Sequence, residues 1–244
     1  MTLILQWTAL AACLACTAWR LPAMLRGRNR SLFWIFAMTS VCVGLSIPAI
    51  YLPVDALLGG INIANAILRV SLFAVFFLLA SKIAAAYNSP LARKMIRGPV
   101  GIAVLVFCSV GIWTTFLFSN KGPSSAGLSD VEDHTLLTVY GWFGMAYMVY
   151  AAACVVGPTA KAAFSRRPAL DRTSALLMSI GFALVLLTVP IQLLPNASEP
   201  LMGPVSFSAV LFVAAGMALV WVSFIRRPMA APAQAKSATG TAAG

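Results

Sequence analysis

The sequence predicts an all-α, polytopic membrane protein with seven transmembrane helices, and three observations lead to that fold class. The composition is 61% hydrophobic and only 9% charged, far outside the usual range of soluble globular domains. Seven apolar runs are each long enough to cross a hydrocarbon core about 30 Å thick. Basic residues cluster in alternate connections between those runs. We therefore expect one membrane domain over residues 1–227 and a disordered cytoplasmic tail over residues 228–244.

Each apolar run is bounded by charged residues, Pro, Gly or Asn, which are typical helix-ending signals. The expected spans cover residues 2–20, 31–51, 61–83, 98–118, 136–157, 173–194 and 203–225. The first run has no basic segment before it and its arginines follow it, so we expect a retained helix rather than a cleaved signal peptide.

Two connections have a distinct composition. Residues 52–60 carry Pro53 and the Gly59-Gly60 pair, which are typical of a tight turn that returns the chain to the bilayer. Residues 119–135 are rich in Ser, Gly and acidic residues and predict an exposed loop. Its acidic residues match neither a calcium-loop nor a zinc spacing, so we expect no metal there.

The distribution of basic residues predicts the orientation of the chain. Positive charge marks the cytoplasmic side of membrane proteins. Fifteen of the 17 basic residues fall in the connections after the first, third, fifth and seventh spans: Arg20, Arg26, Arg28, Arg30, Lys82, Arg93, Lys94, Arg97, Lys161, Arg166, Arg167, Arg172, Arg226, Arg227 and Lys236. The N-terminus is therefore expected outside the cell and the C-terminus in the cytoplasm, in the plasma membrane. We expect no acidic residue within a span.

The third span carries the one basic residue that falls well inside an expected helix. Asn62, Asn65 and Arg69 are spaced i, i+3 and i+7, which predicts one polar stripe on an otherwise apolar helix. Arg69 would lie roughly 12 Å below the start of that helix, given the helical rise per residue. An arginine at that depth needs water, a partner or an anion.

Polar residues of other spans are expected at a similar depth. They are Tyr140, Gln192 and the segment from Trp113 to Thr115. If these faces converge, they form an outward-facing polar pocket with Arg69 at its floor, and a small anionic ligand or a lipid headgroup would bind there.

Two alternatives give Arg69 and its neighbours only structural roles. Arg69 could extend to lipid phosphates, or pair with Asp55, Glu132 or Glu199. Tyr140 could anchor its helix at the membrane surface, as aromatic residues commonly do.

Several function classes are disfavoured by what the sequence lacks. It shows no nucleotide-binding glycine loop, no metal-ligand cluster and no nucleophile-base pair, so we expect neither an enzyme nor a cofactor. The net charge of +11 reflects membrane topology, and we expect no nucleic-acid partner. All five cysteines fall within apolar runs, which predicts packing rather than disulfides.

The run from Asp55 to Asn65, DALLGGINIAN, is followed by a long third span and a basic loop. In this it resembles uncharacterised actinobacterial seven-helix membrane proteins that are often labelled as transporters. Ile61 stands where that pattern has a proline, and longer members add a cytoplasmic C-terminal domain. The resemblance implies a bacterial plasma membrane protein and no established activity.

Two functions remain open. The first is a non-enzymatic sensor or interaction protein, with its basic cytoplasmic loops available to a protein partner or to anionic lipid. The second is a small permease or transporter subunit for an anionic or polar solute.

Overall fold

A computed structural model describes residues 2–27, 30–118, 134–193 and 198–226, and every regular element in these ranges is an α-helix. The elements are α1 (Thr2–Leu25), α2 (Arg30–Leu45), α3 (Pro48–Leu57), α4 (Ile63–Ala86), α5 (Pro90–Arg97), α6 (Pro99–Phe118), α7 (His134–Ala163), α8 (Ala169–Gln192) and α9 (Ser198–Arg226). The all-α prediction is therefore confirmed for the described ranges.

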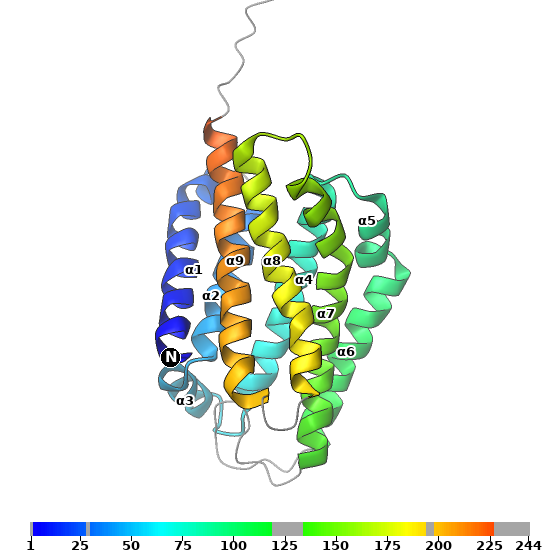
Figure 1. The fold of residues 1–244 in the computed structure, drawn as a ribbon. Coiled ribbons are helices and arrows are strands. Elements are labelled where there is room, and N and C mark those ends of the chain that lie inside the picture. The colour runs from blue at the N-terminus through cyan, green and yellow to red at the C-terminus, as the bar shows by residue number, and fades with distance from the viewer. Residues whose placement is uncertain (1, 28–29, 119–133, 194–197, 227–244) are drawn as a thin grey trace, which may run out of the picture.

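The long helices form one bundle, and the chain runs along it in alternating directions (Figure 1). The short helices α3 and α5 lie at opposite ends of that bundle, which we call the α3 end and the α5 end. The N-terminus lies at the α3 end, whereas α9 finishes at the α5 end (Figure 1).

Six helices are long and apolar enough to cross a membrane: α1, α4, α6, α7, α8 and α9. Helices α2 and α3 provide a seventh span only if the two are counted together, because they are bent by 94° at a short break. The chain is thus a multi-pass helical membrane protein, with six spans by length and composition and up to seven with the bent pair.

The second expected span differs from a straight helix over residues 31–51. Helix α2 ends at Leu45, and α3 starts at Pro48, whose fixed φ and missing N–H suit the first position of a helix. Helix α3 then continues to Leu57, so most of the expected turn over residues 52–60 is helical. Gly59 and Gly60 complete the turn with φ values of +106° and +67°, a region that favours glycine.

The basic connection after α4 contains a helix that the sequence reading treated as loop. Ser89 caps α5, since its hydroxyl oxygen accepts a hydrogen bond from the Ala92 backbone N–H at 3.4 Å. Helix α5 is amphipathic: Ala92 and Ile96 are buried, while Arg93 and Lys94 are exposed.

Several helix boundaries place charged residues inside helices, contrary to expectation; α7, for example, ends at Ala163 and includes Lys161. Helix α1 continues to Leu25, so Arg20 lies within it and is only 7% exposed. Helix α8 starts at Ala169 rather than residue 173, so Asp171 falls in its first turn and accepts a hydrogen bond from the Ser223 hydroxyl. The expectation that no span contains an acidic residue was wrong for Asp171.

The bundle is held most closely together between α8 and α9. A Cβ added at Gly181 of α8 would lie 2.6 Å from Val213 Cγ2 and 2.9 Å from the Ala209 carbonyl oxygen. Small residues that let helix backbones approach are a common means of association in membranes. All five cysteines are free and lie in helices, so the prediction that they form no disulfide is confirmed.

Candidate functional site: a cavity with a cationic end

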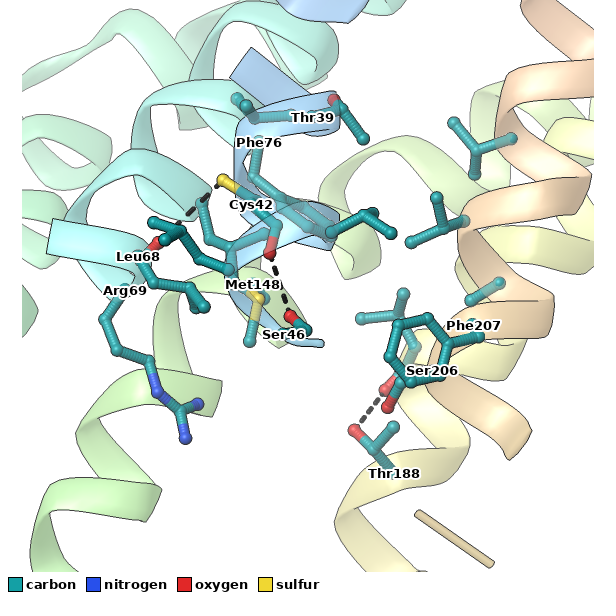
Figure 2. Close-up of a pocket in the computed structure, with 18 of the residues that line it drawn as sticks. Thr39, Cys42, Ser46, Leu68, Arg69, Phe76, Met148, Thr188, Ser206 and Phe207 are labelled. Atoms are coloured by element: carbon teal, nitrogen blue, oxygen red, sulfur yellow. Dashed lines mark hydrogen bonds between the residues drawn. The ribbon is translucent and has the colours of Figure 1, made fainter. Parts of the chain in front are cut away.

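A cavity of about 570 Å³ lies inside the bundle, between α1, α2, α4, α7, α8 and α9. Its volume is within the range of sites that bind small molecules. Figure 2 shows Arg69 on the α4 side of this cavity, with Thr188, Ser206 and Phe207 across it on α8 and α9. Of the five residues proposed from the sequence, Asn65, Arg69 and Gln192 line the cavity.

Most of the polar lining side chains gather toward the α3 end; the exception is Thr39, six residues before the end of α2, whose hydroxyl donates to the Ile35 carbonyl of its own helix at 2.7 Å. Each helix contributes the others from the part of its length nearest that end: Gln6 of α1, Asn65 and Arg69 of α4, Thr188 and Gln192 of α8 and Ser206 of α9, together with Ser46 at the α2–α3 break and Tyr51 of α3. Farther toward the α5 end, the lining is mainly apolar, including Leu79, Phe182, Val213 and Met217. The cavity is therefore polar at one end and apolar at the other.

Asp55 fixes the start of α4 against α3 at the polar end. Its side chain is fully buried, with 0% exposure. Its Oδ2 accepts a hydrogen bond from the Asn62 backbone N–H at 2.9 Å, and its Oδ1 accepts one from the Ala64 N–H at 3.0 Å. These donors are among the first N–H groups of α4, which lack a partner within the helix. Asp55 therefore lies in a helix and not in an exposed turn.

Asn62 does not belong to a helical polar stripe, contrary to the sequence prediction. It precedes α4 and has φ +61°, in the left-handed region that Asn tolerates better than most residues. Its Oδ1 accepts a hydrogen bond from the Tyr51 hydroxyl at 3.1 Å. Asn62 is 1% exposed and does not line the cavity, so it supports the α3–α4 connection behind the site.

Asn65 and Tyr140 join α4 to α7. The Tyr140 hydroxyl donates to Asn65 Oδ1 at 2.9 Å, and both side chains are buried. Because Tyr140 is only 3% exposed, it is a partner within the bundle rather than an anchor at the membrane surface. Tyr140 does not itself line the cavity, but its bond to Asn65 holds a residue that does.

Arg69 lies against α7 and faces the bundle. Its Cζ is 5.7 Å from the centre of the Tyr140 ring, a distance that allows a cation–π contact. A Cβ added at Gly144 would lie 2.7 Å from Arg69 Nη1, so only a glycine leaves room for the guanidinium in this position. The side chain is half-buried, and its Nε is buried with no hydrogen-bond partner.

Arg69 does not pair with Asp55. Asp55 directs both carboxylate oxygens to backbone N–H groups of the α3–α4 connection. Among the described side chains, which do not include that of Glu199, no carboxylate forms an ion pair with Arg69. Glu132 and the acidic part of the expected loop, as well as the tail over residues 228–244, lie outside the described residues.

The other predicted members of the pocket divide into two groups. Gln192 lies beside α7, since a Cβ added at Gly141 would be 3.5 Å from its Nε2. In contrast, Trp113 is 41% exposed on α6, and the Thr115 hydroxyl donates to the Gly111 carbonyl of its own helix at 2.6 Å. Neither residue lines the cavity.

The sequence reading missed the contributions of α1, α2 and α9. Gln6, Ser46 and Ser206 lie in largely apolar runs, and scattered hydroxyl residues there often bond only to their own helix, as Ser46 does to the Cys42 carbonyl at 2.8 Å. Gly144 also escaped notice. A glycine in an apolar helix gives no sign of function in the sequence, because only the structure shows that Gly144 lies against Arg69.

Among the residues that the structure describes, no cluster of His, Cys, Asp or Glu is suited to hold a metal ion. The polar groups that line the cavity are instead a guanidinium, amides, hydroxyls and the thiols of Cys13 and Cys42. This set can bind an anion through hydrogen bonds and charge, and it contains no obvious general base. Comparison with protein-family models, with curated proteins and with solved structures finds no match for this chain.

Proposed function

We propose that the chain is a seven-span, non-enzymatic plasma-membrane protein that senses or binds a small anionic ligand at the polar end of its cavity. The observation that carries this proposal is the environment of Arg69. It is a cation at a cavity wall with a buried Nε lacking a partner and no paired carboxylate among the described residues. The half-buried guanidinium thus lacks a counter-charge among the described side chains, and an anion bound in the cavity would supply one.

The seventh span in this proposal is the bent pair α2–α3. Helix α2 alone has 16 residues and extends about 24 Å, most of a hydrocarbon core. Helix α3 would then lie near the membrane surface, nearly perpendicular to α2. The exposed basic residues of α5 favour a cytoplasmic α5 end and leave the polar end of the cavity toward the outside. They would also be available to anionic lipid or a cytoplasmic protein partner.

The proposal is tested by binding of hexanoate to the purified protein in zwitterionic lipid nanodiscs, measured by calorimetry beside hexanol. Wild-type protein should bind hexanoate more tightly than hexanol. Arg69→Gln should weaken hexanoate binding roughly tenfold or more, since a hydrogen bond to a charged group contributes about 1.5–3 kcal/mol.

Arg93→Gln is the matched control, because it removes an exposed arginine of α5 far from the cavity. It should bind hexanoate like the wild type. Equal hexanoate binding by wild type and Arg69→Gln would refute an anion site at Arg69.

A small permease is the second candidate, and the break between α2 and α3 favours it. Interrupted helices often line the substrate site of transporters, and Ser46, Pro48 and Tyr51 bring this break to the cavity wall. Uptake of labelled hexanoate into proteoliposomes separates the two candidates. A sensor binds without flux, whereas a permease gives uptake that Arg69→Gln reduces.

A further inference from the structure

We propose that the ligand is a single-chain amphiphile with an anionic headgroup, bound with its head at Arg69 and its apolar tail extended toward the α5 end. This inference rests on the proposed anion site and adds the chemical class of the ligand. It starts from the division of the cavity into a polar end and an apolar end.

The apolar part of the cavity continues directly from the cation. On α4, the lining residues Arg69, Leu72, Val75, Phe76 and Leu79 follow one helix face. The ten steps along the chain from Arg69 to Leu79 correspond to about 15 Å along the helix. Helix α8 repeats this order in the opposite chain direction, from Gln192 through Thr188 to Val185 and Phe182.

A compact anion such as phosphate would leave most of this length unfilled. An apolar tail, in contrast, would contact the buried Phe182 and Leu79 and replace empty space with packing. Met148 and Met217 also line the cavity. Their flexible side chains adapt to irregular apolar shapes, which suits a tail of variable conformation.

The volume favours one tail over two. At about 30 Å³ for each non-hydrogen atom, the share of a water molecule in the liquid, a cavity of this size holds on the order of 20 such atoms. Hexadecanoate has a similar number of non-hydrogen atoms, whereas a phospholipid with two long chains has more than twice as many. A headgroup of either carboxylate or phosphate type satisfies Arg69.

The test is a chain-length series of alkyl carboxylates from hexanoate to hexadecanoate. Binding is measured by native mass spectrometry, which counts bound molecules, with affinities referred to the aqueous monomer. The matched alkanols test the headgroup, hexadecyl phosphate distinguishes phosphate from carboxylate, and a dioleoyl phosphatidate tests a two-chain ligand. Affinity should rise by up to about fourfold per methylene until the tail fills the cavity, and then level off.

Ala214→Leu shortens the apolar end, because Ala214 is buried and lines the cavity on α9. It should lower hexadecanoate affinity at least tenfold and leave hexanoate affinity unchanged. Ala215→Leu makes the same change at the next residue, which is exposed, and should bind the whole series like the wild type. Val185→Phe on α8 provides a second obstruction if Ala214→Leu does not fold.

The outcomes separate this inference from the proposed function. The anion site and the tail assignment are both supported if binding depends on Arg69, strengthens with chain length, and gains nothing from longer tails in Ala214→Leu. Hexanoate binding as tightly as hexadecanoate overturns the tail assignment and leaves the anion site standing. If alkanols bind as tightly as carboxylates and Arg69→Gln has no effect, the anion site and the amphiphile assignment are both overturned. Stronger binding of the phosphatidate than of any single-chain compound overturns the single-tail assignment.

Discussion

The α8–α9 contact and the α4–α7 contact both depend on glycine, but glycine has a different role in each. At Gly181 and Gly216, an added Cβ would meet the backbone of the facing helix as well as its side chains. At Gly144, the nearest atoms would belong to the side chain of Arg69. The first contact is limited by two backbones and is therefore fixed. The second leaves space for a charged side chain that can move.

This difference suggests a division of roles around the cavity. Helices α8 and α9 form a closely packed wall, whereas the α4 side combines apolar packing, such as that of Phe73 against Tyr147, with the side-chain hydrogen bonds of Asp55, Tyr51 and Tyr140. Substitutions on the two sides should accordingly have different effects on stability and on binding.

The largest expected effect is on the hydrogen-bonded side, from Asp55→Ala. This change leaves the buried N–H groups of Asn62 and Ala64 without their carboxylate acceptor. Each orphaned group costs about 1–3 kcal/mol, so the free energy of unfolding should fall by about 2–6 kcal/mol. The free energy of unfolding is measured in mixed micelles of mild detergent and SDS, with circular dichroism as the signal. Asp55→Asn keeps one acceptor oxygen and should lose about half as much; a wild-type midpoint for Asp55→Ala would contradict this account of the α3–α4 connection.

The next effect is on the packed side, from Gly181→Ala. The new methyl group would lie within 3 Å of Val213 Cγ2 and the Ala209 carbonyl oxygen, and overpacking of this kind costs about 1–3 kcal/mol. Gly157→Ala on α7 is the control, since a Cβ there meets nothing within 4 Å. The control should be neutral or stabilising by up to about 1 kcal/mol, because alanine favours helices over glycine. Unfolding free energies that shift alike in both variants would show that the α8–α9 contact is looser than described.

The smallest effect on stability should come from Gly144→Ala, which displaces the mobile end of Arg69 rather than a backbone. We expect the free energy of unfolding to change by less than about 1 kcal/mol, since the loss of contacts is offset by helix propensity. Hexanoate binding should weaken because the guanidinium no longer occupies its position beside Tyr140. Calorimetry in nanodiscs checks this, again with Gly157→Ala as the control. Hexanoate binding that stays at the wild-type level would show that the position of Arg69 beside Gly144 is unimportant.

Apolar runs of spanning length predicted most of the long helices, because burial of the backbone in lipid requires helical hydrogen bonding. They did not predict the break after Leu45, since the flanking residues are largely apolar and the one breaking signal, Pro48, is also tolerated inside transmembrane helices. The helix α5 was missed for a related reason. With Pro at its first position and only eight residues, it is too short for a periodicity search to separate from a basic loop.

The candidate site was partly predictable because a deeply placed arginine in an apolar run is conspicuous. Arg69, Asn65, Tyr140 and Gln192 do come together, through helix contacts that their similar depth suggested. The prediction for Asn62 was wrong because the expected span began at residue 61, two residues before α4, and Asn62 has a left-handed backbone conformation outside the helix. The apolar end of the cavity could not be predicted, because residues such as Leu79 and Val213 have the same composition whether they pack together or surround a space.

The Asp55 contacts also have a mechanical consequence. The Asp55 carboxylate binds the backbone at the start of α4, so α3 and the start of α4 should move as one unit. The chain can bend next to this unit at the short break of Ser46 and Ile47. Helix α3 belongs to the cavity wall, because Pro48 and Tyr51 line the cavity. A change in the angle between α2 and α3 would therefore be carried into α4, the helix that bears Arg69, instead of being absorbed by the glycine turn.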